Sequence, residues 1–519
     1  MSVGHVRDSK NARILLDEAS EYFDSLSETE VAFINAVANG RSYCPPGVDE
    51  SNAISDQSEQ GCWTKWPTTR IIKASVIEWL CTSYNCRSII TRRGIDLRQA
   101  LVAGKVDLFG ANIPFQLSLI WCAIPDGIQL ISLNAQNVNF HGSFFGPPQG
   151  ISKQRVLELD RSRIDGILAL KGGFRAYGPV SISGSYIRGD VCVDRSHFSA
   201  VEENDERSIS LYAENIKVEG DFQMRKTHAS GQISLRSSEI HGDLEISDVA
   251  LDAPVALFLD GVSVHGIFTM LGDNIVPGAV DVSGMTCRVL RDRVASWPKL
   301  IMLSGFEYNK IDGFSDVDLN KRFEWLGRYD RIVEIFAHSP QMPSIQYNLS
   351  PYTQLAEVLR RQGWERESDA VLIRAAAIRH ASMWPSYSEW RIAPRESLRM
   401  LGGWLVMSMY WAFLRYGYNR SQPLAWLLVL WAVGVCLFQI VPNSIVLKDY
   451  NGPIWLAPYL VSLDMLIPPI NIGVRDSIDL NNTTISGLMY CISVAGWFLV
   501  SIWVVGLTGF VRGASIGKS

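Results

Sequence analysis

Three aspartates at the same position of a repeat are the residues of this sequence that could do chemistry together. Asp190, Asp221 and Asp243 each follow a glycine directly, within a repeated apolar pattern. Carboxylates held on neighbouring repeats could bind a cation or act as an acid/base pair on a polysaccharide. The alternative is an aspartate that hydrogen-bonds its own turn. This alternative is favoured because Ile167 and Ile267 occupy the same position, so we expect no catalytic residues here.

Other residue types that mark active sites are scattered along the chain. Five histidines fall one at a time on the repeats, where we expect turn or solvated roles: His141, His197, His228, His241 and His265. The nine cysteines form no CxxC pair, which favours a reduced compartment and argues against a zinc site. The sequence also has no GxGxxG, GxxxxGK[ST], HExxH or GxSxG motif. We therefore predict no enzyme, no cofactor and no metal.

One acidic residue lies in a strongly apolar setting near the end of the chain. Asp464 belongs to the segment 453–473, which Pro468 and Pro469 interrupt. A carboxylate at membrane depth is costly unless it faces water or a partner. The segment is therefore a candidate re-entrant pore segment, although it has no TVGYG-type carbonyl filter. The alternative is an external loop whose apolar residues lie on the bilayer surface.

The middle of the chain repeats a glycine-anchored pattern of alternating apolar residues. Alternation with a period of two indicates strands, and a recurring interval of roughly 23 residues indicates a solenoid. Most anchors lie about a dozen residues apart: Gly166, Gly178, Gly189, Arg207, Gly220, Gly231, Gly242, Ala253, Gly266 and Gly278. We expect each glycine to supply the positive φ of a corner. The pattern predicts a parallel β-helix over 93–290, with about eight turns and two short strands per turn.

Composition separates this polar region from an apolar tail. The 519 residues include 19% charged residues and have a mean hydropathy of +0.08, between the values typical of soluble and membrane proteins. Ranges 424–441 and 483–511 contain no charged residue and are long enough to cross a bilayer. Range 400–414 is shorter and is expected to be an interfacial helix. We predict that 400–519 is a membrane domain with two transmembrane helices.

The remaining parts of the chain are expected to be helical. Residues 1–92 have helix-compatible apolar spacing and would cap the first turn of the β-helix, whose strand edges would otherwise be open. Residues 291–399 are predicted to be a helical linker. Within it, 351–361 and 365–380 are separated by Gly363 and should form an αα-hairpin.

Charge distribution predicts the membrane topology. Arginines precede the first apolar range and follow the second, whereas the loop between them has few, so both termini should be cytoplasmic and 442–482 external. The first 30 residues lack an apolar leader segment, so we expect a multi-pass protein of the bacterial inner membrane. Five residues are candidate contacts to lipid headgroups: Trp390, Arg391, Arg395, Arg399 and Trp404. The net charge of -5 gives no reason to expect nucleic acid as a partner.

Several stretches from about residue 90 onward resemble one family. They are RGIDLRQALVAGKVDL at 93–108, PYTQLAEVLRRQGWERESDAVLI at 351–373, RYGYNRSQP at 415–423, YLVSLDMLIPP at 459–469 and AGWFLVSIWVVGLTGFVR at 495–512. The chain is similar to bacterial membrane proteins of the β-helix, pentapeptide-repeat-like kind, which are often labelled membrane-associated oxidoreductases. The resemblance implies an inner-membrane protein with a cytosolic β-helix, and it implies no proven reaction.

These observations favour a membrane-anchored cytosolic β-helix scaffold without catalysis. Its partners would be membrane lipid and either another protein or further copies of the chain, because solenoids present long recognition surfaces. The first alternative is a homo-oligomeric pore or membrane-permeabilising effector gated by the β-helix. The second is an oxidoreductase, which the family label implies and which no cofactor motif supports.

Overall fold

The computed structural model forms two compact units, Met1–Gln362 and Gly363–Ser519, which are described separately. It describes the backbone of residues 10–46, 60–200, 208–312, 318–336, 348–384, 394–416, 418, 421–440, 445–447, 453–467, 474, 478–480 and 483–507.

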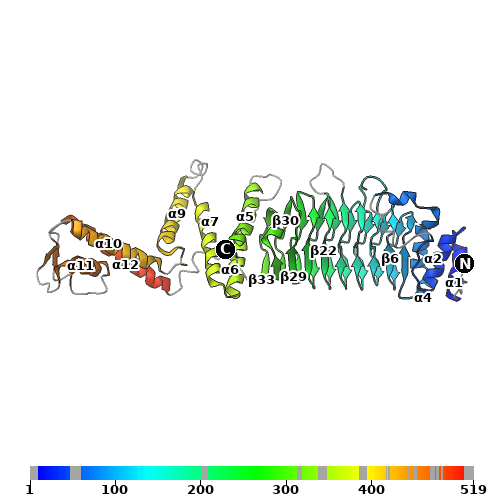
Figure 1. Cartoon of the computed structure of the whole chain (residues 1–519), viewed down its shortest axis with the longest axis horizontal. Helices are drawn as coiled ribbons and strands as arrows, with labels where there is room; N and C mark the ends of the chain where they lie inside the picture. The colour runs from blue at the N-terminus through cyan, green and yellow to red at the C-terminus, as the bar shows by residue number, and fades with distance from the viewer. Residues whose placement is uncertain are drawn as a thin grey trace. The chain divides into compact units, whose positions relative to one another are not determined.

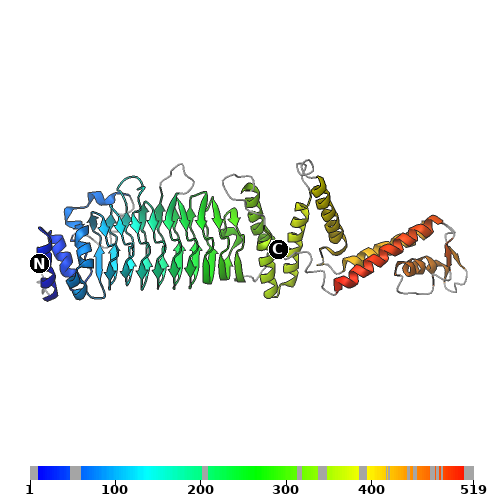
Figure 2. The ribbon, with the colours of Figure 1, turned by 180° about the vertical axis from the view of Figure 1, so that it is seen from behind.

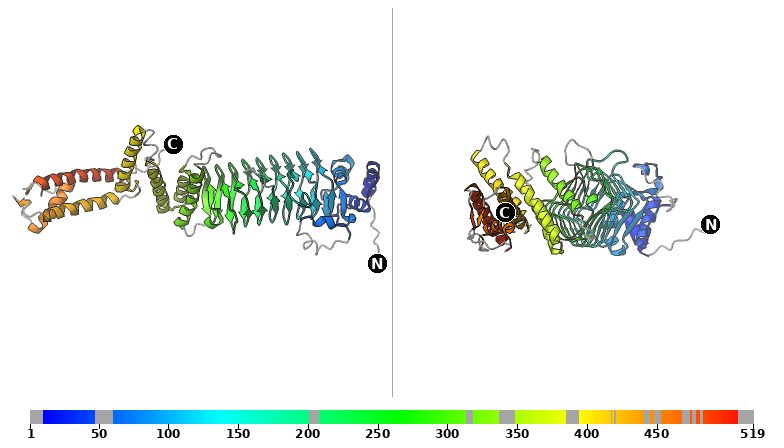
Figure 3. Two further views of the ribbon diagram at one scale, coloured as in Figure 1. Left: turned by 90° about the horizontal axis from the view of Figure 1, so that it is seen from above. Right: turned by 60° about the vertical axis from the view of Figure 1, so that its left-hand side comes forward.

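The first unit is built around a parallel β-solenoid of about nine turns (Figure 1). Each turn, here called a coil, contains four short strands rather than the two expected from the sequence. Strands at the same place in successive coils pair in parallel and form four rows. Each row is named after its strand in the coil at residues 95–113, which gives the β2, β3, β4 and β5 rows. The coils stack without interruption along the unit (Figure 3). The predicted β-solenoid is therefore confirmed.

The bounds of the strands show how short they are. The β3 row contains β1 (Ile71–Lys73), β3 (Leu101–Ala103), β7 (Ala123–Ile124), β11 (Phe144–Phe145), β15 (Arg175–Tyr177), β19 (His197–Ser199), β23 (His228–Ala229) and β27 (Ala250–Leu251). The β4 row contains β4 (Val106–Asp107), β8 (Ile128–Gln129), β12 (Leu157–Glu158), β16 (Val180–Ser181), β20 (Ile209–Tyr212), β24 (Gln232–Ser234), β28 (Val255–Phe258), β30 (Ala279–Asp281) and β32 (Leu300–Met302).

The other two rows merge into one sheet at the far end of the solenoid. The β2 row contains β2 (Ile95–Arg98), β6 (Leu117–Ile120), β10 (Val138–Asn139), β14 (Leu168–Ala169), β18 (Val191–Cys192), β22 (Phe222–Arg225) and β26 (Leu244–Ser247). The β5 row contains β5 (Asn112–Ile113), β9 (Asn134–Ala135), β13 (Arg163–Ile164), β17 (Tyr186–Ile187), β21 (Lys217–Val218) and β25 (Glu239–Ile240). Both rows continue through β29 (Ser263–Leu271), β31 (Thr286–Asp292) and β33 (Glu307–Asp312).

The solenoid extends beyond its predicted end at residue 290. Strand β31 pairs with β33, so paired strands continue to Asp312. The glycine pattern missed this coil because β31 has no glycine at the corner. Val289 of β31 pairs with Ile267, the residue that follows Gly266 in β29. The strand register therefore persists after the sequence signal has ended.

Apolar columns fill the interior of the solenoid. In the β2 row, Leu168 pairs with Val191, which pairs with Phe222, and all three are fully buried. Fully burying each such side chain contributes roughly 1.5–3 kcal/mol. Aromatic rings form a second column, with centroids 5.1 to 5.7 Å apart along Phe140, Phe145, Phe174 and Phe198. The repeating pattern of the sequence is thus a repeating set of inward-facing positions.

Helices cover the first coil, as expected. They are α1 (Lys10–Tyr22), α2 (Glu28–Ala38), α3 (Ala74–Thr82) and α4 (Tyr84–Ile89) (Figure 2). Two 3-10 turns lie in the same region, η1 (Cys62–Lys65) and η2 (Thr68–Arg70), and Trp63 of η1 packs against Phe144 and Tyr177 of later coils. Tyr43 pairs with the outer edge of β2, because its N–H donates to Asp96 O at 2.8 Å and its carbonyl accepts from Arg98 N at 2.9 Å. The cap therefore satisfies backbone groups that would template aggregation if left open.

Two helices cover the last coil: α5 (Leu319–Phe336) and α6 (Ser350–Arg361). Arg322 of α5 forms a bidentate ion pair with the fully buried carboxylate of Asp292, with N–O distances of 2.6 and 2.8 Å. Gln362 donates to Ile311 O at 3.0 Å and accepts from Ile311 N at 3.3 Å. The Gln362 side chain thus bonds backbone groups that a further strand would bond, while the Arg322–Asp292 pair joins α5 to β31.

Most anchor glycines are required by space rather than by a positive φ, which corrects our expectation. Gly220, Gly242 and Gly266 are absent from the positive-φ residues of the described chain, and positive φ occurs instead at other corners, such as Arg161 and Arg195 with φ of 54°. A Cβ added at Gly242 would overlap Asp221 Oδ1 and lie 2.5 Å from Gly220 O. The preceding coil leaves no room for a side chain.

The second unit consists of helices and one small antiparallel strand pair. The helices are α7 (Glu365–Ser382), α9 (Pro394–Leu414), α10 (Gln422–Ile440), η4 (Ile454–Leu456), α11 (Ala457–Leu466) and α12 (Thr483–Leu507), and the strands are β34 (Ile445–Leu447) and β35 (Ile478–Leu480). Among the described residues only α10 is long and apolar enough to cross a membrane, and 28% of its apolar window is buried in the protein. The two-span arrangement stays a prediction, since the apolar stretch found in α12 is shorter, Ser486–Ser501.

The first testable prediction concerns the crowded corner. Gly242→Ala should destabilise the protein by roughly 1–3 kcal/mol, because the added methyl group must displace the backbone or the carboxylate of the preceding coil. Gly327 is the matched control, since it lies in α5 and a methyl group added there would have nothing within 4 Å. Gly327→Ala should be neutral or stabilising by up to about 1 kcal/mol. Urea unfolding of both variants measures the difference, and equal stabilities would contradict the crowding argument.

Candidate functional site

The three aspartates of the solenoid form a hydrogen-bonded ladder. Asp190 Oδ1 accepts from Asp221 N at 2.9 Å, and Asp221 Oδ1 accepts from Asp243 N at 2.8 Å. The series continues in both directions with other partners, because Asp243 Oδ1 accepts from Ile267 N at 2.7 Å and Asn137 Oδ1 accepts from Ile167 N at 2.8 Å. Each side chain thus bonds the next coil, which corrects our expectation of a bond within its own turn.

The ladder explains why the aspartates follow glycines. Each accepting oxygen lies where the Cβ of the next coil's glycine would be, as at Gly220 beneath Asp190 and at Gly266 beneath Asp243. An amide oxygen serves in the same way at Asn137, and Ile167 and Ile267 occupy the position without a charge, so the position does not require a carboxylate. The geometry therefore favours a structural role for these residues over acid/base catalysis.

Asp464 lies within the apolar core of the second unit. It is 3% exposed on α11, which packs against both α10 and α12. Ser462 Oγ on the same helix donates to Trp431 O at 3.1 Å, and Trp431 Nε1 donates to Tyr459 O at 3.1 Å. Buried apolar residues surround these contacts: Leu427, Phe438, Ala457, Val461, Met465, Leu466, Met489, Ile492 and Leu499.

Two glycines allow α11 to approach its neighbours closely. A Cβ at Gly434 of α10 would overlap Ser462 Oγ, and a Cβ at Gly496 of α12 would overlap Leu466 O. Such close helix contacts through small residues are typical of membrane helices. The described part of segment 453–473 contains a helix packed against α10 and α12, and its re-entrant placement in a membrane stays a prediction. Pro468 and Pro469 lie outside the described residues.

The structure describes three of the five predicted headgroup contacts. Arg395 and Arg399 are exposed on α9, whereas Trp390 and Arg391 lie outside the described residues. Trp404 is partly buried in an aromatic cluster of α7 and α9, with ring centroids 5.3 Å from His380 and 4.9 Å from Trp384. Its indole packs against protein here, and a role at the lipid interface stays a prediction.

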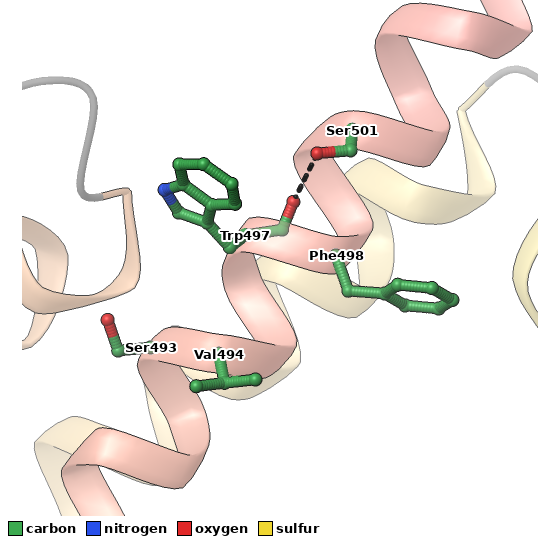
Figure 4. Close-up of a pocket in the computed structure, with 5 residues that line it drawn as sticks. All are labelled: Ser493, Val494, Trp497, Phe498 and Ser501. Atoms are coloured by element: carbon green, nitrogen blue, oxygen red, sulfur yellow. Dashed lines mark hydrogen bonds between the residues drawn. The ribbon is translucent and has the colours of Figure 1, made fainter.

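One face of α12 is apolar and exposed. Figure 4 shows Val494, Trp497 and Phe498 on this face, with Ser493 and Ser501 beside them, around an open hollow of about 460 Å³. Val494 is 72% exposed and Trp497 is 57% exposed. Ser501 Oγ donates to Trp497 O at 2.8 Å, so its hydroxyl is satisfied within the helix. Such a face suits lipid or another apolar helix better than water.

The corner between the β2 and β3 rows holds a basic hollow that the sequence analysis did not identify. It measures about 450 Å³, and its lining includes Lys171, Arg195, Arg225 and Lys226. Arg225 is paired with Asp194, with Nη2 and Oδ2 2.7 Å apart. Burial and the nearby Lys171 ammonium lower the pKa of His141, which also lines the hollow. The remaining positive charge could hold an anionic group. Its only sequence signal is a basic residue at successive coil corners.

Coil stacking also brings histidines together that the sequence analysis considered singly. His197 and His228 stack in the β3 row with ring centroids 6.1 Å apart. His241 and His265 meet edge to face beside the β5 row, with centroids 4.4 Å apart. Both pairs come from adjacent coils. The interval of roughly 23 residues in the sequence indicates the pair His241 and His265, which are 24 residues apart, but not His197 and His228, which are 31 apart.

No known protein family, curated protein or solved structure matches this chain. The resemblance to pentapeptide-repeat-like membrane proteins therefore stays an expectation. The class of protein that the fold defines is a β-solenoid with helices at both ends.

The second testable prediction separates the two roles of the aspartate ladder. Asp221→Asn should keep the stability of the protein within about 0.5 kcal/mol, because the amide oxygen still accepts from Asp243 N. Asp221→Ala should cost roughly 1–3 kcal/mol by leaving that N–H without its acceptor. Thermal unfolding of the two variants gives the comparison. Equal losses in both would mean that the charge matters and would revive the catalytic or cation-binding interpretation.

Proposed function

We propose that this protein is a bilayer-anchored scaffold whose β-solenoid binds a protein partner or a second copy of the chain. The observation that carries the proposal is the straight columns of polar side chains on the β5 row. Arg163 pairs with Tyr186, Tyr186 with Lys217, and Lys217 with Glu239 along four coils. Repeat proteins commonly use such extended regular surfaces for recognition.

The columns combine charge with aromatic surface. The Arg163 guanidinium lies 5.0 Å from the centre of the Tyr186 ring, and the Tyr186 hydroxyl donates to Glu219 at 3.3 Å. Tyrosine and arginine are enriched where proteins recognise one another. Arg188 is exposed next to this pair and extends the same surface.

The second unit would anchor the scaffold. Helix α10 has the length and composition of a membrane span, and most of its apolar window is not covered by protein. We propose an inner-membrane location with both termini cytoplasmic, supported by the arginine distribution. In this arrangement the solenoid meets cytosolic partners, and the oxidoreductase activity that the resemblance implies is not needed.

The third prediction tests the recognition surface in native membranes. A photo-crosslinking amino acid at Arg188 should give one discrete adduct, either with the chain itself or with one other protein. The same amino acid at His228, which is exposed in the β3 row, is the matched control and should give at least about tenfold less adduct. Mass spectrometry of the adduct names the partner.

Two outcomes would contradict the scaffold proposal. One is equal labelling at Arg188 and His228, which would mean that the polar columns are not a recognition surface. The other is a stoichiometric flavin or nicotinamide in the absorbance spectrum of the purified full-length protein.

The packing of α11 favours a second candidate function, a homo-oligomeric pore. A short helix with a buried acidic residue lies between two longer apolar helices, α10 and α12. A carboxylate in such surroundings is costly unless it serves water, an ion or a partner. Two long helices per chain cannot enclose a pore, so several chains would be required. Asp464 would then line the conducting path or its mouth.

The fourth prediction decides between anchor and pore. Full-length protein in liposomes should conduct cations if it is a pore, and Asp464→Asn should lower the preference for cations over anions. Asp221→Asn, in the solenoid, is the control and should leave flux unchanged. Vesicles that stay tight with correctly inserted protein would exclude conduction under the conditions used and leave the anchored scaffold.

A further inference from the structure

A group of histidines and glutamates on the polar face has the composition of a metal site. The residues are Glu219, Glu239, His241 and His265. Strands β21, β25 and β29 position them: Lys217 pairs with Glu239, and Glu239 with Ser263. The same register, two residues further on, aligns Glu219, His241 and His265 in one column. The His241 and His265 side chains are 29% and 48% exposed, so a dissolved ion can reach them.

The distances suit a small metal ion. Ligand atoms of Glu239, His241 and His265 lie within 4.8 Å of one another. Glu239 Oε1 is 3.4 Å from His241 Nε2 and 3.8 Å from His265 Nε2. Ligands bound tetrahedrally at about 2.0–2.2 Å from Zn²⁺ are separated by roughly 3.3–3.6 Å. A small rotation of the exposed His265 ring would close the remaining gap.

Glu219 is placed to orient the first histidine. His241 Nδ1 is buried without a hydrogen bond and faces Glu219 Oε2 at 3.5 Å. A metal-binding imidazole usually donates its second N–H to a carboxylate, which fixes the ring and leaves the other nitrogen free to bind. Here that arrangement would direct His241 Nε2 towards Glu239 and His265. Glu219 is thus a positioning residue rather than a ligand.

The local charge also admits a cation. Lys217 Nζ lies 3.5 Å from Glu239 Oε2 and 3.7 Å from Glu219 Oε1. It therefore occupies the outer oxygen of each carboxylate and leaves the inner oxygens facing the imidazoles. The two carboxylates thus place negative charge beside the imidazoles, which suits a bound cation.

We propose that Glu239, His241 and His265 form a binding site for a divalent transition-metal ion of the Zn²⁺ type, with a fourth position open to solvent. Two imidazoles and one carboxylate suit zinc and its neighbours rather than calcium or magnesium. The proposal departs from our expectation that the histidines have only solvated or turn roles. It lies on the proposed recognition surface, so an ion here could be completed by a side chain of the partner.

The experiment uses full-length protein purified in detergent without a histidine tag and freed of metal by a chelator. Titration with Zn²⁺ should show one saturable equivalent that is missing from the His241→Ala/His265→Ala double variant. Zinc that the double variant still binds is held by other residues such as the cysteines, and this amount is subtracted from the binding by the native protein. Glu219→Gln should weaken binding roughly 10- to 100-fold while keeping the stoichiometry. Co²⁺ in place of Zn²⁺ should give visible absorption bands of a four-coordinate ion.

The titration has a control variant outside the proposed site. His228→Ala removes one histidine of the stacked pair in the β3 row and should leave zinc affinity and the cobalt spectrum unchanged. Circular dichroism checks that every variant keeps the solenoid. Zinc binding of equal affinity in the double variant, or no saturable binding by the native protein, would overturn the proposal and leave only polar contacts between the histidines and glutamates. Neither result depends on whether the photo-crosslinks at Arg188 form.

Discussion

The solenoid depends on one constraint, the close backbone stacking of each coil on the preceding one. At the glycine corner, Gly242 N donates to Gly220 O at 3.0 Å, while the carboxylate of Asp221 accepts from the next backbone N–H. These two contacts use all the space that a side chain would need. The glycine of one coil thus leaves free the space that the aspartate of the preceding coil occupies. Serines also form hydrogen bonds between coils inside the solenoid. For example, Ser162 Oγ donates to Leu130 O at 2.6 Å.

Constant stacking has a consequence for the outer surface. Inward positions hold apolar residues or buried serines of limited size, whereas outward positions are constrained only by their neighbours in the same column. Ion pairs can therefore accumulate there, and Lys217 bridges two carboxylates of neighbouring coils. Partly exposed pairs of this kind contribute little stability. Their regular placement matters more for what the surface can bind, which is why the scaffold and metal proposals both depend on the β5 row.

The second unit obeys a different constraint. Its helices approach through Gly434 and Gly496, so that α11 fits between α10 and α12 with Asp464 buried. Outside these contacts, large apolar side chains such as Val494 and Trp497 remain exposed. An apolar exterior around a core that contains a carboxylate is expected in a bilayer, where the solvent is apolar and polar groups turn inward.

The sequence by itself determined the solenoid and its helical ends, because strand alternation and the glycine interval are local properties of consecutive residues. It did not determine the four strands per coil, the coil that ends at Asp312 or the reason for the glycines. These features depend on the contacts that each residue makes with the neighbouring coil. The pairing of His241 with His265 likewise arises only when coils stack. In α11, burial of Asp464 required the packing of this helix between α10 and α12. Tertiary structure decided these features because contacts between coils and between helices join residues that no local pattern connects.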